Sequence, residues 1–79
     1  MSLDLAFIEY DEDRHEWRLF SPNRDEMAPL PPGWQSVQNG DDLEHVNRIL
    51  QSWFYRLATE GWAQDGSRWV IAVQRLRRE

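Results

Sequence analysis

One segment of the chain has a clear helical repeat, and it restricts what the rest can fold into. Leu43, Val46, Leu50, Trp53 and Leu57 are separated by 3, 4, 3 and 4 residues, which places them on one face of an α-helix. The repeat predicts an amphipathic helix over residues 41–60. A chain of 79 residues has room for one thin core, so this helix needs a single apolar surface to pack on.

Both ends of the predicted helix have recognisable signals. Asp41 is followed three positions later by Glu44, a capping-box variant with Asp in place of Ser or Thr. Gly61 stands where a glycine commonly follows the last helical turn. Asn39-Gly40 predicts a turn just before the helix.

β-forming residues precede the helix. Residues 3–10 and 16–20 predict a β-hairpin whose short link is entirely polar. Residues 21–33 contain all four prolines and predict a surface loop that is partly polyproline-like. Residues 34–37 (WQSV) predict a further short strand.

The C-terminal third predicts a second hairpin. Asp65-Gly66 is a dipeptide favoured in type I′ turns, and it would bring Trp62 and Trp69 close together. Apolar residues occupy both alternations of residues 69–76, which indicates a central strand. The expected fold is α+β: a small antiparallel sheet of three to five strands with one amphipathic helix across one face. The expected order is β-β-(β)-α-(β)-β, in a single domain over residues 1–79.

The motif LPPGW at residues 30–34 resembles the opening of WW domains, which bind proline-rich peptides. The resemblance ends there. Trp53 lies nineteen residues after Trp34, but Tyr55 stands where the family has proline, and no tyrosine pair precedes Trp53. Helical periodicity between the two tryptophans also disagrees with a three-stranded sheet. We interpret the motif as turn chemistry that inserts Trp34 into the core.

Composition excludes several classes of function. The chain has no cysteine, which removes thiol catalysis and cysteine-ligated zinc and is compatible with a reducing compartment. Its apolar runs are too short to span a bilayer, and no stretch resembles a signal peptide. Signatures of nucleotide-binding proteins, hydrolases and metalloproteases are missing from the sequence. We therefore expect a cytoplasmic protein with no membrane contact, no cofactor and no metal.

The net charge of −5 is unevenly distributed. Residues 1–44 carry eleven carboxylates against three arginines, a net −8, whereas residues 45–79 carry six arginines against three carboxylates, a net +3. Excess acid of this kind favours a non-catalytic binding protein that contacts a basic protein surface, such as an accessory subunit, an immunity-type protein or a phage-type inhibitor. Tyr55 is expected to point outward because three consecutive aromatic residues on a helix diverge by about 100° each. The predicted partner-binding residues are Asp11, Glu12, Asp13, Glu16, Asp25, Glu26 and Tyr55.

Two alternatives remain open on the sequence alone. The chain could be a nucleic-acid-binding regulator that uses its Arg-rich C-terminal strand, with contacts from Arg68, Arg75, Arg77 and Arg78. It could also be a minimal enzyme built around one of its two histidines, His15 or His45.

Overall fold

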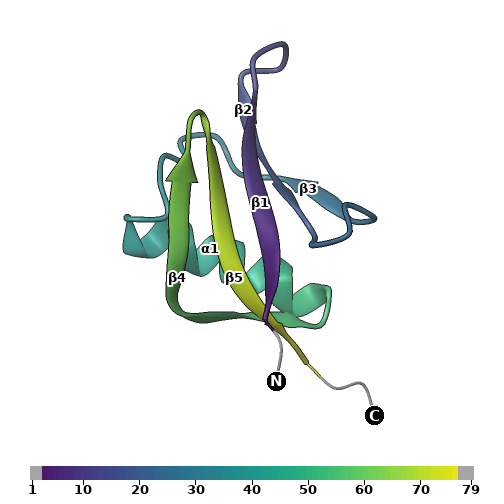
Figure 1. Ribbon diagram of the computed structural model, residues 1–79. Helices are drawn as coiled ribbons and strands as arrows, with labels where there is room; N and C mark the ends of the chain where they lie inside the picture. The colour runs from purple at the N-terminus through teal and green to yellow at the C-terminus, as the bar shows by residue number, and fades with distance from the viewer. Residues whose placement is uncertain (1–2, 77–79) are drawn as a thin grey trace.

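The computed structural model describes residues 3–76, except for the side chains of residues 59–61. The elements are β1 (Asp4–Asp11), β2 (Glu16–Phe20), β3 (Met27–Pro29), α1 (Gly40–Ser52), β4 (Tyr55–Asp65) and β5 (Arg68–Arg75). The strands form one antiparallel sheet in the order β3-β2-β1-β5-β4 (Figure 1). The predicted fold class, α+β with one helix packed on an antiparallel sheet, is confirmed.

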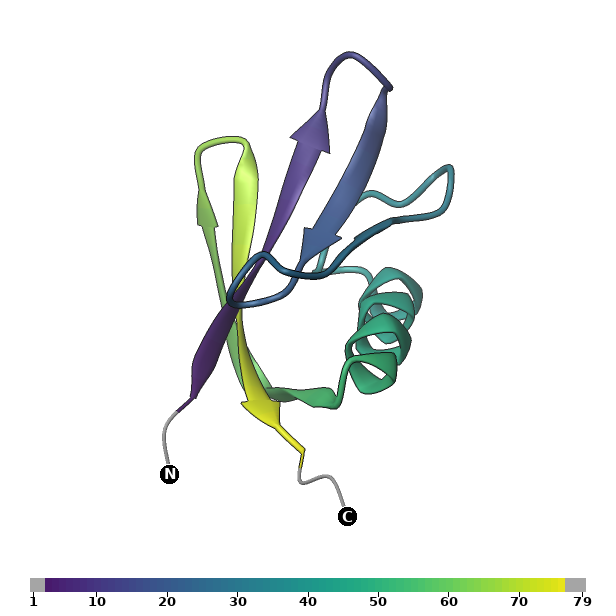
Figure 2. The same ribbon diagram turned by 90° about the vertical axis from the view of Figure 1, so that its right-hand side faces the viewer.

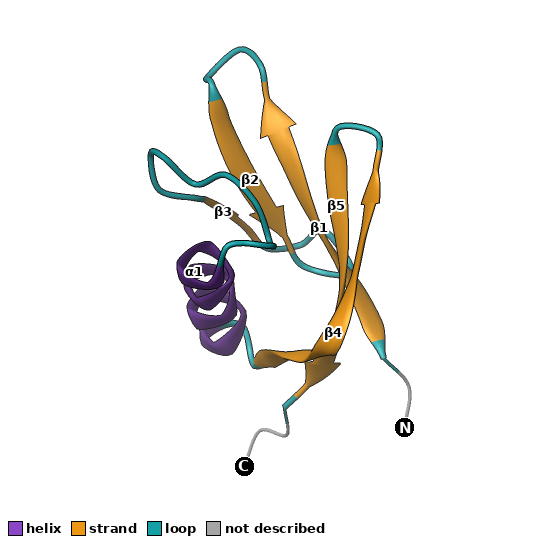
Figure 3. Ribbon diagram, turned by 90° about the vertical axis from the view of Figure 1, so that its left-hand side faces the viewer, coloured by secondary structure: helices purple, strands orange, loops and turns teal. Residues whose placement is uncertain are grey.

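The helix lies against one face of the sheet, which we call the inner face (Figures 2 and 3). Side chains of this face are fully buried at the centre of the sheet, with Ala6, Ile8 and Ile71 at most 1% exposed. Val46 and Leu50 of α1 meet them and are 0% exposed. The predicted core position of Leu50 is confirmed, and half-buried Trp53 packs against the same core. No helix within residues 3–76 is long and apolar enough to cross a membrane.

The predicted first hairpin is confirmed, and Asp11 closes its turn. β1 and β2 pair from Phe7 opposite Phe20 to Asp11 opposite Glu16. The Asp11 carboxylate accepts the backbone N–H groups of Asp13 at 3.0 Å and Arg14 at 3.2 Å. A side chain that replaces backbone partners in this way fixes a turn without the Asn-Gly signal.

The third strand comes from the segment predicted to be a loop. β3 occupies residues 27–29 and pairs with β2 at the edge of the sheet. Proline is tolerated at a sheet edge because no ladder hydrogen bond is required of its nitrogen there, and this allows Pro29 in the strand. Residues 34–37, predicted as a strand, are instead a loop held by the Asp42 carboxylate, which accepts the N–H groups of Gln35 and Ser36.

The LPPGW motif is a turn, as interpreted. The Trp34 N–H donates to the Pro31 carbonyl at 3.1 Å, and Gly33 has a φ of +89°, a value that glycine adopts readily. Trp34 is 4% exposed, and its indole N–H donates to the Asp42 carbonyl at 3.0 Å. The segment therefore anchors the start of α1 to the core.

The predicted helix boundaries are wrong at both ends. Asn39 is the N-cap, and its side chain accepts the N–H groups of Asp41 and Asp42. The helix is therefore capped by Asn39, which was predicted to lie in a turn, and not by Asp41. The helix ends at Ser52, and Phe54 then adopts a φ of +65°, which reverses the chain. Residues 55–65 form β4, so Gly61 lies within a strand and does not terminate the helix.

The second hairpin is confirmed, but its turn differs in type. Asp65 pairs with Arg68, which leaves Gly66 and Ser67 as the loop. Gly66 has a φ of +64° and Ser67 does not have a positive φ, the pattern of a type II′ turn. The Trp62 and Trp69 rings lie 5.4 Å apart edge to face, as predicted.

We expect Leu50→Ala to lower the free energy of unfolding by about 2–5 kcal/mol, because it leaves a cavity between helix and sheet. Gln51→Ala on the exposed side of the same turn should change it by less than about 0.5 kcal/mol. Urea denaturation followed by tryptophan fluorescence measures both. Equal effects would show that the helix face is assigned wrongly.

We expect Gly66→Ala to lower the free energy of unfolding by about 1–3 kcal/mol, because a non-glycine residue is strained at positive φ. A methyl group at this position would meet nothing within 4 Å, so the effect should come from the backbone alone. Gly40 is equally open but lacks positive φ. Gly40→Ala should therefore be neutral or stabilising by up to about 1 kcal/mol, and a similar loss in both variants would contradict the turn assignment.

Candidate functional site

The structure separates the predicted acidic contact residues into two groups. Asp11, Glu12, Asp13 and Glu16 surround the β1–β2 turn, which projects from one end of the sheet (Figure 1). Asp25 and Glu26 lie in the β2–β3 connection, at the opposite end of β2. A five-residue strand is about 16 Å long, so the two groups cannot contact one small epitope together.

Within the turn, two of the four carboxylates have structural partners. Arg18 forms ion pairs with Asp11 at 3.2 Å and with Glu16 at 3.3 Å. Glu12 and Asp13 are exposed, and their carboxylates make no hydrogen bond or ion pair with a described residue. The unpaired carboxylates of this end are therefore those of Glu12 and Asp13, and the exposed Arg14 next to them also lacks a side-chain partner among the described residues.

The second acidic group lies near Tyr55. Asp25, Glu26, Tyr55 and Arg75 line one small depression of about 250 Å³. Tyr55, however, is only 8% exposed, and the expectation that it points outward is wrong. It begins β4 and does not belong to the helix, so its ring faces the core.

An open groove of about 690 Å³ lies beside the β1–β2 turn, between the hairpin, segment 29–34 and the start of α1. This size is typical of ligand sites. The Trp17 ring packs edge to face against Tyr10 and against Trp34, each at 5.2 Å between ring centroids. Tyr10 is 39% exposed and Trp34 is buried, so the accessible aromatic wall is formed by Tyr10 and Trp17.

This wall also carries hydrogen-bond donors. The Tyr10 hydroxyl and the Trp17 indole N–H donate to no residue within 3–76. No buried polar side-chain atom in the described residues lacks a partner, so both groups reach solvent. A ligand in the groove would meet aromatic surface and donors together.

Both histidines line this groove, an arrangement that the sequence did not predict. His15 comes from the hairpin turn, where it has a φ of +54°, and His45 comes from α1. Glu16 is the lining carboxylate, and the lining contains no serine, threonine or cysteine that a histidine could activate. Among the described residues, no three His, Cys, Asp or Glu side chains are grouped to hold a metal.

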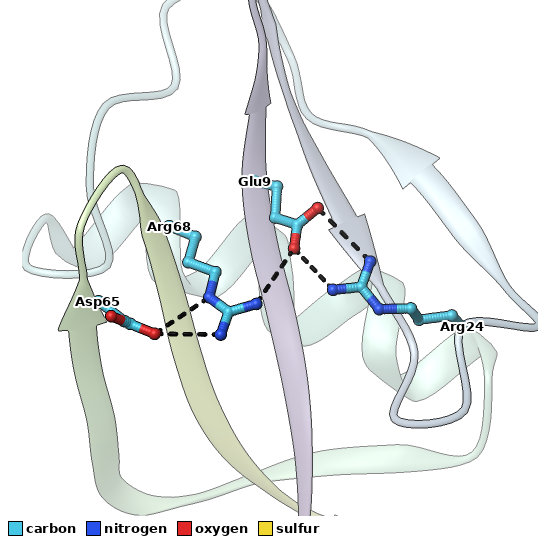
Figure 4. Close-up of polar contacts among 4 residues, drawn as sticks. All are labelled: Glu9, Arg24, Asp65 and Arg68. Carbon is cyan, nitrogen blue, oxygen red and sulfur yellow. Dashed lines mark hydrogen bonds and ion pairs between the residues drawn. The ribbon is translucent and has the colours of Figure 1, made fainter.

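The predicted nucleic-acid contacts do not form one basic surface in the described residues. Arg68 pairs with Asp65 at 3.0 Å and with Glu9 at 3.7 Å, on the face opposite the helix (Figure 4). Arg75 shares the depression with Asp25 and Glu26. Arg77 and Arg78 lie outside the described residues.

Glu9 is the centre of an ion-pair network. It accepts hydrogen bonds from Arg24 at 2.6 and 3.4 Å, and Arg68 approaches it from the other side (Figure 4). The hydrogen bond from Arg24 lowers the pKa of Glu9 below its ordinary value of 4.5, although partial burial opposes the shift. The same bond raises the pKa of Arg24.

We expect Glu9→Gln to lower the free energy of unfolding at pH 7 by about 0.2–1 kcal/mol, the usual range for exposed ion pairs. A carboxylate with a lowered pKa stabilises the fold above its unfolded pKa and loses this effect as the pH falls. The difference from wild type should therefore shrink below pH 4.5. Glu44→Gln, which breaks a more exposed pair with Arg48, serves as control, and a gap that persists in acid would contradict the assignment.

Comparison of the chain with family models, with curated proteins and with solved structures finds no match in any of the three.

Proposed function

We propose that the chain is a non-catalytic binding protein that contacts a basic surface of a partner protein through its β1–β2 end. The observation that carries the proposal is the combination found there. An open groove with an aromatic wall adjoins a projecting turn in which two carboxylates and the Arg14 guanidinium have no partner among the described residues.

The chemistry of this end suits a cationic side chain of the partner. The faces of Tyr10 and Trp17 attract a guanidinium or ammonium group by cation–π interaction. Glu12 and Asp13 attract the same group at longer range and speed the encounter. The free Tyr10 hydroxyl and Trp17 N–H can donate to carbonyl groups of the partner's backbone.

The nucleic-acid alternative has less support. Arg68 already pairs with two carboxylates, and Arg75 lies beside two more. Phosphate binding depends on basic side chains that can replace counterions, and the described arginines of this strand are next to acids. For the enzyme alternative, the groove that holds both histidines contains no serine, threonine or cysteine for them to activate.

The proposal can be tested by photocrosslinking. Tyr10 is replaced by benzoylphenylalanine, and the protein is irradiated in lysate of the source cell. We expect one dominant protein adduct whose yield falls with rising salt, because the steering charges are screened within about 8 Å at physiological ionic strength. Benzoylphenylalanine at exposed Gln51 of α1 is the control position and should give no such adduct.

Charge reversal at Glu12 and at Glu26 tests which end of β2 contacts the partner protein. Glu12→Arg should reduce the adduct yield several-fold, because it reverses an unpaired charge beside the groove. Glu26→Arg changes the net charge equally at the other end of β2 and should have little effect. Equal effects, or micromolar binding of labelled oligonucleotides measured by fluorescence anisotropy, would contradict the proposal.

A further inference from the structure

The face of the sheet opposite α1, which we call the outer face, carries its side chains in rows across the strands. One row is apolar across all five strands, because cross-strand partners in the register are Ala63, Val70, Phe7, Phe20 and Met27. In the part of the chain that the structure describes, no helix or strand covers this face (Figure 2). Leu5 and Met27 are 52% and 46% exposed on it.

The next row towards the hairpin turns has charges that alternate in sign. Asp65 of β4 pairs with Arg68 of β5, Arg68 with Glu9 of β1, and Glu9 with Arg18 of β2. Read across the four strands, the charges are negative, positive, negative and positive. Figure 4 shows part of this row with Arg24 joining it from the β2–β3 loop.

Among the described side chains, the outer face is close to neutral although the chain is acidic. The carboxylates of Glu9, Asp11, Glu16 and Asp65 are matched in number by the guanidinium groups of Arg18, Arg24, Arg56 and Arg68, and the Glu12 carboxylate borders this face at its hairpin end. Two copies of a chain with a net charge of −5 repel each other in general. On this face the local charges add little to that repulsion.

We infer that the outer face is a homodimer interface, with the twofold axis parallel to the strands and between β1 and β5. This operation stacks two sheets face to face and reverses the order of strands within each row. Arg68 then faces Glu9 of the second copy, and Asp65 faces Arg18 of the second copy. In the apolar row, Val70 comes opposite Phe7 of the second copy, and the guanidinium groups of Arg24 and Arg68 lie against that Phe7 ring.

A second copy fits this face better than a charged partner. An interface that is the same on both subunits must be complementary to itself, and an alternating row of even length meets this condition when its order is reversed. A strongly basic partner would find no net negative charge here. Four overlapping strands span about 19 Å, which is small for a stable interface of about 800 Å² per subunit, so the dimer should dissociate at micromolar concentrations.

Sedimentation velocity of the full chain over about 10–500 µM, concentrations that bracket weak association, tests the inference. We expect the wild type to dimerise with rising concentration. Arg68→Glu should weaken dimerisation at least tenfold, because it places like charges opposite each other. Adding Glu9→Arg to that variant should restore it, because the row then reads negative, negative, positive, positive and is still self-complementary when reversed.

The double variant keeps an ion pair between β1 and β5 but loses the pair between Arg24 and Glu9, so urea denaturation of the same variant is used to separate an effect on the interface from one on folding. Arg48→Glu breaks an exposed pair with Glu44 on the helix and should leave dimerisation unchanged. A wild type that stays monomeric at all concentrations would overturn the inference, as would a dimer insensitive to Arg68→Glu or not restored by the double change. The substituted residues Glu9, Arg68 and Arg48 do not line the proposed partner-binding groove, so the two proposals can fail independently.

Discussion

The pairing of β1 with β5 is the interaction on which the rest of the structure depends. It joins residues 4–9 to residues 68–73 and makes one sheet of two hairpins that could each form locally. Closing a loop of about 60 residues carries an entropic penalty, which burial of Ala6, Ile8 and Ile71 at the junction helps to offset. Without this junction α1 would have no inner face to cover.

A single helix can cover one face of a sheet, and in the free monomer the other face is in contact with water. Arginine side chains lie over its phenylalanine rings. The Arg24 guanidinium lies 4.8 Å from the ring centre of Phe7 and 5.0 Å from that of Phe20, and Arg68 lies 5.5 Å from Phe7. The positive φ of Arg24, 57°, belongs to the loop conformation from which its side chain returns over the strands. The rings are thereby shielded while the guanidinium groups keep carboxylate partners.

Local patterns in the sequence predicted local structure correctly. They did not predict features that depend on contacts between distant segments of the chain. The hairpins and the helix face could be predicted from periodicity and turn residues. Leu57 fits a helical repeat and a strand alternation equally well, and nothing in the sequence indicated that Phe54 would adopt positive φ and end the helix. The groove joins His15 to His45 across thirty residues, which only packing reveals. The acidic residues around Arg18 were assigned to a partner because their cross-strand register was unknown.

The two edge strands of the sheet, β3 and β4, are poorly suited to pair with a strand of another chain. β3 has three residues and contains Pro29, which has no N–H to offer an added strand. β4, at the other edge, loses register with β5 between Leu57 and Trp62, so its outer hydrogen-bonding groups do not form a continuous row. Pairing with an added strand, which leads to edge-to-edge aggregation and fibrils, is therefore obstructed at both edges of the sheet. Both open edges of the sheet are therefore poor templates for an added strand.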